Sequence, residues 1–483
     1  MKRGIQNQPR YGSVEDDEPL SFGLTSKHKL FLYGGHVLQA FGDRMWSFAV
    51  PILFMNVWSQ TLLPSALFSF FLYSLGTCLM PYVGRWMDRT DRLRVMTISI
   101  FGQNLAVLVN LALFWCIYVQ SGEGAEYPVW NTPLVLLFAV LLLTTAFAEM
   151  MGSISTMALE KDWLLVMVGN SSAGTRALTA ANTQLRRIDL LTKIVAPAVF
   201  GLVVQSCGSK RQQIIFGLLV VAVYNLLSAY PQYYAVQRLF AYYPALQHRE
   251  QVAAAAAKKQ RGACSVYISH PVFLASFAYS MIYLTVLDNG TLMTAYLQWV
   301  GVPAGLLGLG RGVGAAFGIL GSLMFQPILN SAVMGGSLRR MGVTSIVLFF
   351  LSICPAAVVF HPSWFGDDGM PPLTVGWVML GAVAVARVWL WSFDLAHTQV
   401  LQEEVEEHLR GVINSSQTAC YQWFYVVLAV LGIVFSHPSQ FQVLTLVSVG
   451  SVGTAAVLWT AWTLTCGAKA AADRDSGYYD DKY

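Results

Sequence analysis

Apolar residues fill long stretches of this chain, and short polar segments separate them. A bilayer core about 30 Å thick needs roughly 20 apolar residues per helix, so each stretch can cross a membrane. The alternating pattern of a membrane β-barrel is absent, which leaves helices as the expected spanning element. The pattern predicts about twelve spans, at residues 28–58, 60–84, 93–119, 132–158, 178–206, 212–237, 270–298, 302–326, 338–360, 373–401, 411–435 and 440–467.

One polar segment divides the chain into halves. The sequence AYYPALQHREQVAAAAAKKQRG, at 241–262, is basic and helix-prone, and six predicted spans lie on either side of it. Two six-helix halves are the plan of major facilitator transporters, whose substrates bind near the membrane midplane between the halves. We expect an all-α membrane protein of this fold, with tails at 1–27 and 469–483, bundles at 28–238 and 269–468, and a cytosolic linker at 239–268.

Composition and charge support a membrane location and indicate an orientation. Of the 483 residues, 55% are hydrophobic and only 12% are charged, which is unusual for a soluble globule. Most of the 30 Lys and Arg residues fall in the tails and in alternate loops, notably at 85–94, 238–261 and 339–340. Both termini are therefore expected in the cytosol. The net charge of +4 reflects this orientation and does not indicate nucleic-acid binding. The polar first 27 residues do not resemble a cleaved signal peptide.

Several kinds of site are disfavoured by the motifs. The seven cysteines include no CxxC pair, so neither a disulfide framework nor a zinc site is expected. The chain has no GxSxG, HExxH or phosphate-loop motif, and its soluble segments are too short for an appended catalytic domain. We therefore expect neither an enzyme nor an organic cofactor. A receptor that binds a ligand without transporting it stays open as a further class.

A loop between the second and third spans carries a pattern typical of a transporter gate. The sequence GRWMDRTDRLR resembles the facilitator loop signature G-x-x-x-D-R-x-G-R-R at Gly84, Asp88, Arg89 and Arg92. In such a loop the acid can pair with basic residues or with a helix end and hold the inner gate shut. The alternative interpretation is an ordinary basic loop on the cytosolic side.

A second charged cluster begins the fifth span. The sequence TQLRRIDLLTK places Arg186 and Asp189 one helical turn apart, next to Arg187 and Lys193. This cluster is a second candidate for the inner gate.

The first span contains an acid where lipid would be expected. Asp43 lies in QAFGDRMWSF, and His36, Asp43 and Ser47 are spaced to share one face of a helix. A charge inside a membrane helix costs at least about 2.5 kcal/mol, so it usually lines a cavity or has a partner. Other spans of this half carry oxygen donors, namely Gln103, Asn104, Asn182, Asp189, Asn225 and Gln232. Each amide alone is typical of a helix–helix hydrogen bond, whereas together with Asp43 they could form a cage for a divalent cation.

The second half has two candidate sites. Asp288, Asn289 and Gly290 interrupt the seventh span, which predicts either a broken helix that exposes its ends to substrate or a simple kink. In the tenth span, Asp394 and His397 are one turn apart. They could bind a metal or a proton, or form a satisfied pair in the core.

These residues resemble the ferroportins, a family of iron exporters with the major facilitator fold. The resemblance covers most of both bundles. It rests on GDRMW at 42–46, RLRV at 92–95, DW at 162–163, LRRIDLLT at 185–192, SHPVFLAS at 269–276, TVL at 285–287, and LWSFDL, TQ and RGVIN between 390 and 414.

The resemblance implies export of Fe²⁺, and of related ions such as Co²⁺, by alternating access. Asp43 matches the acid of the first bundle, and Gln103, Asn104 and Asn225 match members of an oxygen cage that holds Ca²⁺ as an activating ion in animal relatives. The resemblance also places the intracellular gate at Asp88, Arg92, Arg187 and Asp189. Asp394 and Arg410 fall within the matching motifs of the second bundle.

The chain also departs from the animal pattern. Ser47 and Leu428 stand where histidine ligands are expected, and Gln232 stands where the cage has a glutamate. Thr291 replaces the cysteine to which the peptide regulator hepcidin docks, so no hepcidin response is expected. Loss of a thiolate and an imidazole should weaken binding of Fe²⁺ and Co²⁺. One hypothesis is a replacement site in the second bundle, formed by Asp288, Asn289, Asp394 and His397.

Our interpretation is a monomeric metal exporter of the plasma membrane or an internal membrane, in which counter-movement of H⁺ could drive the cycle. The alternative substrate is a small organic cation or a metal chelate, carried by a ferroportin-like scaffold.

Overall fold

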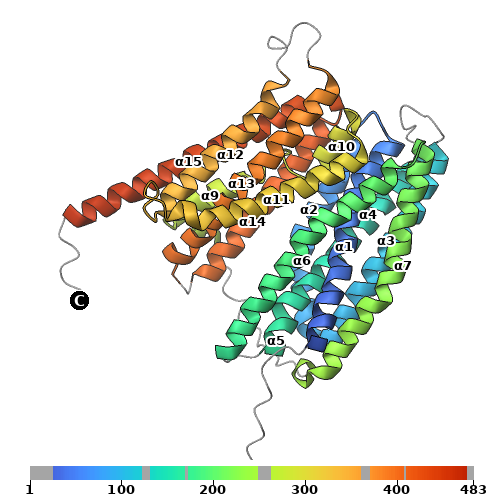
Figure 1. Ribbon diagram of the computed structural model, residues 1–483, viewed down its shortest axis with the longest axis horizontal. Coiled ribbons are helices and arrows are strands. Elements are labelled where there is room, and N and C mark those ends of the chain that lie inside the picture. Colours follow the sequence, from blue (N-terminus) through green and yellow to red (C-terminus); the bar gives the residue numbers. More distant parts are fainter. Residues whose placement is uncertain are drawn as a thin grey trace, which may run out of the picture.

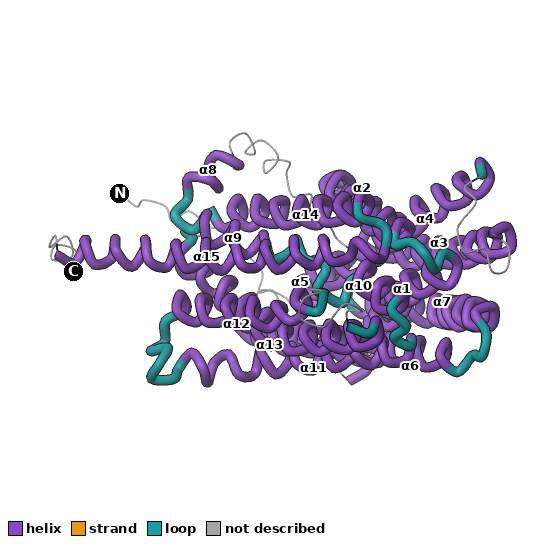
Figure 2. The backbone as a smooth tube through the Cα atoms, turned by 90° about the horizontal axis from the view of Figure 1, so that it is seen from above, coloured by secondary structure: helices purple, strands orange, loops and turns teal. Residues whose placement is uncertain are grey.

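The structure is a computed structural model that describes residues 26–121, 131–168, 172–247, 263–360, 370–406 and 409–475. Within these ranges every regular element is a helix, and no strand occurs. Figures 1 and 2 show the helices gathered into two bundles, one from each half of the chain. The predicted all-α fold is confirmed.

The N-terminal bundle contains α1 (Ser26–Val57), α2 (Leu63–Arg89), α3 (Arg92–Ser121), α4 (Thr132–Ala158), the π-helical turn η1 (Leu159–Trp163), α5 (Leu164–Val168), α6 (Ser172–Gln205) and α7 (Lys210–Tyr242), followed by the 3-10 turn η2 (Pro244–Gln247). The C-terminal bundle contains α8 (Ala263–Ser269), α9 (Phe273–Met281), α10 (Thr291–Trp299), α11 (Ala304–Leu329), α12 (Leu338–Val358), α13 (Pro372–Glu404), α14 (Arg410–Val434), the 3-10 turn η5 (Pro438–Gln440) and α15 (Phe441–Asp475).

Nine helices in the described ranges are long and apolar enough to cross a membrane, so the chain is a multi-pass membrane protein. The other three predicted spans correspond to α1, to α2 and to the pair α9 and α10. α1 carries charged residues in its middle, the apolar segment of α2 whose side chains the structure describes is Leu63–Leu79, and the seventh span is broken into two short helices. The count of twelve spans therefore stays a prediction.

Local sequence signals set the start of several helices. The Asn131 side chain accepts a hydrogen bond from the backbone N–H of Leu134 at 2.9 Å and so caps α4. Ser209 and Gln212 form a reciprocal capping box at the start of α7. α4 consequently begins and ends at the residues that its apolar run predicts, 132 and 158.

The two bundles meet most extensively where α6 packs against α11. A Cβ atom on Gly308 would lie 2.8 Å from the carbonyl carbon of Pro197, and one on Gly201 would lie 3.0 Å from that of Ala304. Both obstacles are backbone atoms, which cannot rotate away. Glycine at these two positions therefore permits the close approach of the bundles.

The hydrophobic core is continuous between the bundles at one end only. Where α1 ends, a single cluster contains Phe54 of the first bundle and Leu292 of the second. Where α1 begins, the clusters around Leu32, Ile413 and Met341 are separate. The bundles are thus closed at the first end and spread apart at the second, as Figure 1 shows. We call these ends the closed side and the open side.

Polar contacts also join the bundles on the closed side. The side-chain amide of Gln298 donates to Asn56 Oδ1 at 3.0 Å, and the backbone N–H of Leu62 donates to the carbonyl of Ser436 at 2.8 Å. These bonds link α10 to α1, and the end of α14 to the start of α2. The closed side is therefore sealed by both apolar packing and hydrogen bonds.

Candidate functional site

Five of the predicted metal-site residues surround one small cavity inside the N-terminal bundle. α1 contributes Asp43, α3 contributes Gln103 and Asn104, and α7 contributes Asn225 and Gln232. The cavity has a volume of about 10 Å³, which is the space that one water or one ion needs. The amide of Gln103 donates to Asp43 Oδ1. The structure therefore brings one carboxylate and four amides together, and we call this group the N-bundle cage.

Two amides of the cage are oriented by their own helices. Asn104 Nδ2 donates to the carbonyl of Ile100, and Asn225 Nδ2 donates to the carbonyl of Val221, both at 2.8 Å. A carbonyl can only accept, so the amide nitrogen must point to it, and each amide oxygen stays free to accept. The two asparagines do not hydrogen-bond to a neighbouring helix in the described part of the chain. Their oxygens are available to a cation.

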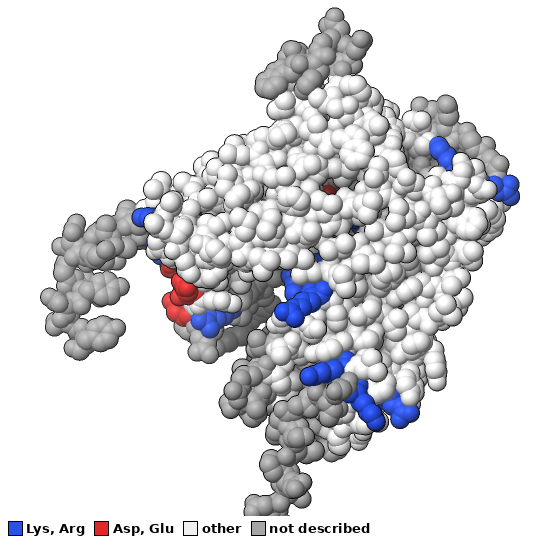
Figure 3. All heavy atoms as spheres, viewed as in Figure 1, with Lys and Arg blue, Asp and Glu red and all other residues white. Residues whose placement is uncertain are grey.

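Ser47 lies outside the cage. Its hydroxyl donates to the carbonyl of Arg44 at 3.2 Å, and the residue lines a larger cavity between the bundles. This central cavity has a volume of about 230 Å³ and is lined by α1, α6, α11 and α13, with four cationic side chains: Arg44, Lys193, Arg311 and Arg387. In Figure 3, Lys and Arg side chains lie in the hollow between the bundles.

These four cationic groups have no close acidic partner. Within the described ranges, none of them lies within 4.0 Å of a carboxylate. Arg311 donates to Thr294 Oγ1 at 2.7 Å and lies over the Phe48 ring at 4.7 Å. Three of the acids that interact with the four at longer range accept hydrogen bonds elsewhere, namely Asp43, Asp189 and Asp288. The wall of the central cavity is therefore positively charged.

Sequence reasoning missed one acid close to the cage. Glu149 of α4 is half-buried, and its carboxylate interacts electrostatically with Asp43 and Arg44. It interrupts the apolar run TTAFAEMMGS, which is the same kind of signal that singles out Asp43. A second carboxylate therefore accompanies Asp43 inside this bundle.

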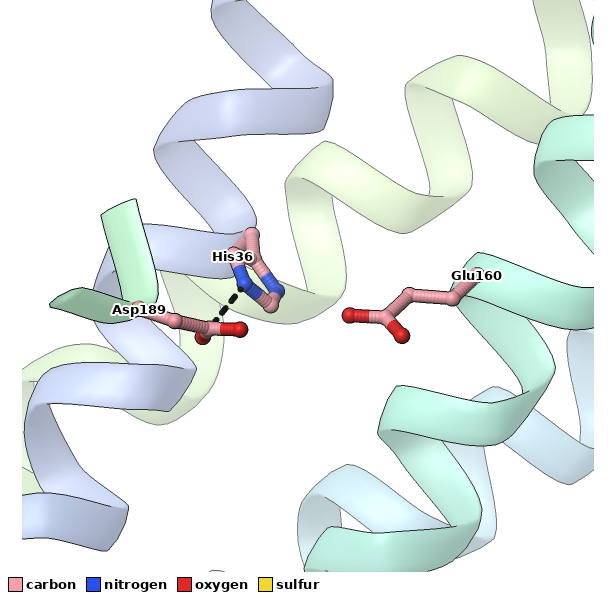
Figure 4. A group of neighbouring side chains, drawn as sticks. All are labelled: His36, Glu160 and Asp189. Atoms are coloured by element: carbon pink, nitrogen blue, oxygen red, sulfur yellow. Dashed lines mark hydrogen bonds and ion pairs between the residues drawn. The ribbon is translucent and has the colours of Figure 1, made fainter. Parts of the chain in front are cut away.

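A second group of metal-binding side chains lies nearer the open side. His36 of α1, Glu160 of η1 and Asp189 of α6 offer one ligand atom each, and all three atoms lie within 4.8 Å of one another. His36 Nε2 is 3.0 Å from Asp189 Oδ1. Figure 4 shows the Glu160 carboxylate directed at the other edge of the imidazole ring. The sequence places His36 on one face with Asp43, but its pairing with Asp189 and the approach of Glu160 were not predicted.

The first predicted gate forms contacts within its own bundle. Arg92 Nε donates to Asp162 Oδ1 at 2.9 Å, and its guanidinium also donates to the carbonyl of Leu246 at 3.4 Å. These bonds tie the start of α3 to η1 and η2. The side chain of Asp88 lies outside the part of the chain that the structure describes.

The second predicted gate reaches the other bundle. The Arg186 guanidinium lies over the ring of Trp391 in α13, 5.4 Å from its centroid. Arg187 donates to Gln184 Oε1 of its own helix at 3.1 Å. Arg410 donates to two backbone carbonyls at the end of α13 and so caps that helix. In this state only Arg186, of these three gate candidates, makes a contact between bundles within the described ranges.

The seventh span is broken at the predicted place, between α9 and α10, with Gly290 as the N-cap of α10. Asp288 Oδ1 accepts from the backbone N–H of Gly290 at 2.7 Å. Asp288 lines a cavity of about 20 Å³ together with Thr291 and Leu428, the two positions at which the resemblance implies metal ligands in animal relatives. Asn289 lines the central cavity, and it also lines a further cavity of about 10 Å³ together with Asp288.

The other C-bundle candidates lie around Tyr279. The Tyr279 hydroxyl donates to Asp394 Oδ1 at 2.5 Å, and its ring stacks on His397 with centroids 3.9 Å apart. His397 is buried, and its Nε2 lies 3.3 Å from Gln417 Nε2. None of the cavities described above is lined by Asp394 or His397. The structure therefore separates the four residues of the hypothetical replacement site into two places.

Comparison with known sequences gives one family. The sequence model of the Ferroportin1 (FPN1) family matches residues 26–452. Solute carrier family 40 member 1 of Oryza sativa subsp. japonica is 31% identical over 89% of this chain and 89% of its own length. The ferroportin of Homo sapiens is 24% identical over 90% of this chain and 91% of its own.

Solved structures share the fold. A bacterial homologue of the iron transporter ferroportin, in an inward-facing state, has a TM-score of 0.74 at 24% identity over 91% of this chain and 99% of its own. An outward-facing structure of such a homologue has a TM-score of 0.60 at 24% identity, over 90% and 99% of the two chains. The xylose transporter XylE from E. coli has a TM-score of 0.54 at 10% identity, over 88% and 95%. The major facilitator fold that the sequence predicts is confirmed.

Proposed function

We propose that this chain, which belongs to the ferroportin family, exports Fe²⁺ and related divalent ions such as Co²⁺ from the cytosol by alternating access. The relatives are named as transporters and not as enzymes, in agreement with the motifs that the sequence lacks. Direction and metal preference are part of the proposal.

One observation carries it: a carboxylate and four amides surround a cavity of about 10 Å³ inside a membrane bundle. A buried acid is costly at about 2.5 kcal/mol or more, so its retention indicates a ligand or a partner. Its partner in the structure is a neutral amide, Gln103, which cannot neutralise the charge. Oxygen donors with a net negative charge suit a divalent cation. We infer that Asp43 is the principal ligand of the transported ion.

The cage residues also fit Ca²⁺, the activating ion that the family resemblance implies. Ca²⁺ prefers six to eight oxygen ligands, and Asp43 with the amide oxygens of Gln103, Asn104, Asn225 and Gln232 offers a set of that kind. When bound, Ca²⁺ supplies charge that balances Asp43. With Gln232 in place of an acid, the cage carries less negative charge, and its affinity for Ca²⁺ should be lower than that of an otherwise equal site with glutamate.

The orientation of the cycle follows from charge. The basic loops assign the open side to the cytosol, so a cytosolic ion can reach the space between the bundles. Closure would bring the open ends together around Arg186 and Trp391, which already touch across the bundles. The contacts of α6 with α11 and of α2 with α14 would then have to separate. Close backbone packing at Gly201 and Gly308 is compatible with such a movement.

Further parts of the proposal concern coupling and partners. Asp43 and Glu149 are carboxylates that can take up protons when the metal leaves, which would couple export to H⁺ antiport. Metal export that is independent of an imposed pH gradient would remove this coupling.

We also propose a monomer in the plasma membrane or an internal membrane that does not respond to hepcidin, since Thr291 has no thiol.

The experiment is metal flux in proteoliposomes, with Fe²⁺, Co²⁺, Mn²⁺, Ni²⁺ and Ca²⁺ compared in parallel. Asp43→Ala should lower transport of every accepted ion by at least about tenfold, because even indirect contacts to a metal site are worth that much. Glu403→Gln, an exposed acid of α13, is the matched control and should transport normally. Equal flux in both variants would contradict the proposal.

A second candidate substrate is an anionic metal chelate, and the central cavity favours it. A divalent ion about 8 Å from one unpaired unit charge is opposed by roughly 4 kcal/mol at an effective dielectric constant of 20. Four such charges line this cavity, so a bare metal ion or an organic cation is disfavoured there. A carboxylate-bearing chelate would instead be attracted, and the arginine guanidinium groups could bind its carboxylates.

Flux of radiolabelled citrate, measured with and without Co²⁺, tests the chelate. If the chelate is carried, citrate should move only together with Co²⁺, and Arg311→Gln should reduce both fluxes equally. Arg238→Gln, an exposed arginine of α7, is the control. Co²⁺ flux without citrate, unaffected by Arg311→Gln, would leave the bare ion as the substrate.

A further inference from the structure

The imidazole of His36 has one nitrogen in use and one without a partner. Nε2 lies 3.0 Å from Asp189 Oδ1, and His36 is only 3% exposed. Within the described part of the chain, no group forms a hydrogen bond with the buried Nδ1 atom. A buried polar atom without a partner costs free energy and calls for an explanation.

The pairing with Asp189 determines which form of the ring is present. A carboxylate only accepts hydrogen bonds, so Nε2 carries the proton and donates it in a hydrogen bond to Asp189. In the neutral ring, Nδ1 then presents a lone pair. This is the usual arrangement of a metal-binding histidine, in which a carboxylate orients the ring through the nitrogen opposite the metal. Asp189 already occupies that orienting position.

Glu160 supplies an anionic group on the side of the free nitrogen. Figure 4 shows its carboxylate directed at the ring edge opposite the Asp189 contact. One ligand atom from each of His36, Glu160 and Asp189, which for His36 is either ring nitrogen, lies within 4.8 Å of the other two. Two atoms bound to one ion at about 2.1 Å each lie at most about 4.2 Å apart. Glu160 is half-buried, and a small adjustment of its side chain would bring its carboxylate within this separation of the imidazole.

The backbone presents Glu160 by an uncommon feature. Residues Leu159–Trp163 form a π-helical turn where α4 meets α5. Such turns are rare, and they occur frequently at functional sites because they change which side chains face inward. Figure 4 shows that the three residues come from three different segments, so no local turn chemistry explains their proximity.

We propose that His36 Nδ1 and the Glu160 carboxylate bind a divalent first-row transition metal ion, with Asp189 positioning the imidazole. An imidazole nitrogen with carboxylate oxygens suits Fe²⁺, Co²⁺ and Mn²⁺, whereas Ca²⁺ and Mg²⁺ favour sites made of oxygen alone. The N-bundle cage offers only oxygens, so the two sites differ in selectivity.

The place of the new site indicates its role. His36 precedes Asp43 by seven residues in α1, which is about 10 Å along the helix toward the open side. An ion that comes from the cytosol would meet His36 and Glu160 first and the cage afterwards. This inference rests on the proposed metal transport, and it makes the first site the one that selects transition metals over Ca²⁺.

Binding of Co²⁺ to the purified full-length protein, measured by calorimetry, tests the inference. The wild type should bind two ions, Glu160→Gln one, Asp43→Ala one, and the double variant none. Glu160→Gln should weaken its site at least about tenfold, and it leaves the pair of His36 with Asp189 unchanged. Glu403→Gln, an exposed acid of α13, is the matched control and should bind both ions.

Two further measurements separate the sites. Pulsed electron paramagnetic resonance of bound Mn²⁺ should show coupling to an imidazole ¹⁴N nucleus in the Asp43→Ala variant and lose it in Glu160→Gln. Excess Ca²⁺ should displace the ion from the cage but not from His36. If Glu160→Gln binds as the wild type does while Asp43→Ala binds nothing, the new site is refuted and the cage stands. The opposite pattern would refute the cage and leave the new site in place.

Discussion

Tyr73 of α2 stacks on Tyr425 of α14, with ring centroids 4.3 Å apart and ring planes within 5° of parallel. The two rings belong to different bundles and line the same small cavity as Asp288. This stack is therefore a contact that holds the two bundles together, and we call it the tyrosine lock.

Removal of this stack should favour opening of the closed side. An aromatic pair contributes about 0.5–1.5 kcal/mol beyond its buried area, so Tyr425→Ala should shift the ratio of the two states roughly two- to tenfold. Distances between spin labels on α2 and α14 would measure the shift. Tyr425→Phe keeps the stack and should leave the distances unchanged; a distance distribution in Tyr425→Ala equal to that of the wild type would refute the lock.

The contact of α6 with α11 should not tolerate a side chain at Gly308. Valine there would meet the backbone of Pro197, and overpacking of this kind costs about 1–3 kcal/mol. We expect Gly308→Val to shift the protein away from the conformation of this structure, as the same spin labels would show. Gly381→Ala in α13 is the control, because a Cβ there meets no described atom within 4 Å.

The ion pair of Arg92 and Asp162 should stabilise the N-terminal bundle. Its side chains are 9% and 24% exposed, and a hydrogen bond to a charged group contributes about 1.5–3 kcal/mol. Asp162→Asn should therefore lower the unfolding temperature in detergent, whereas Glu403→Gln should not. A melting curve of Asp162→Asn that coincides with the wild type would show that the pair contributes nothing in this state.

The cavity that holds Thr291 and Leu428 should accept a rebuilt metal site. Both positions line one space of about 20 Å³ with Asp288. The double change Thr291→Cys and Leu428→His adds a thiolate and an imidazole, which are strong ligands of Co²⁺. We expect the variant to bind one additional Co²⁺, detectable by sulfur-to-cobalt charge-transfer absorption. Thr291→Ser with Leu428→His lacks the thiolate and should show no such band.

Much of the architecture and of the cage could be predicted from the sequence. Apolar runs define long helices because the bilayer imposes their length, and α4 agrees with its prediction at both ends. Asp43 and its amides could be predicted to converge because polar groups inside spans must face each other or water. Three polar residues in an apolar run predicted either a break or a kink near Gly290, and the structure has the break.

Other features depend on tertiary contacts that no local pattern encodes. The rotation of each helix decides that Asp189 meets His36 rather than Arg186, and that the four cations face the central cavity. Glu160 was invisible for a different reason: a π-helical turn changes the register of a helix by one residue without a signature in composition.

That widened turn has a mechanical consequence. Glu160 and Asp162 are two positions apart and leave the turn in different directions, one toward His36 and the other toward Arg92 at the start of α3. If the proposed site at His36 binds a metal ion, that ion and the Arg92 contact would act on the same five residues. Deletion of one residue from the turn should therefore redirect both acids together.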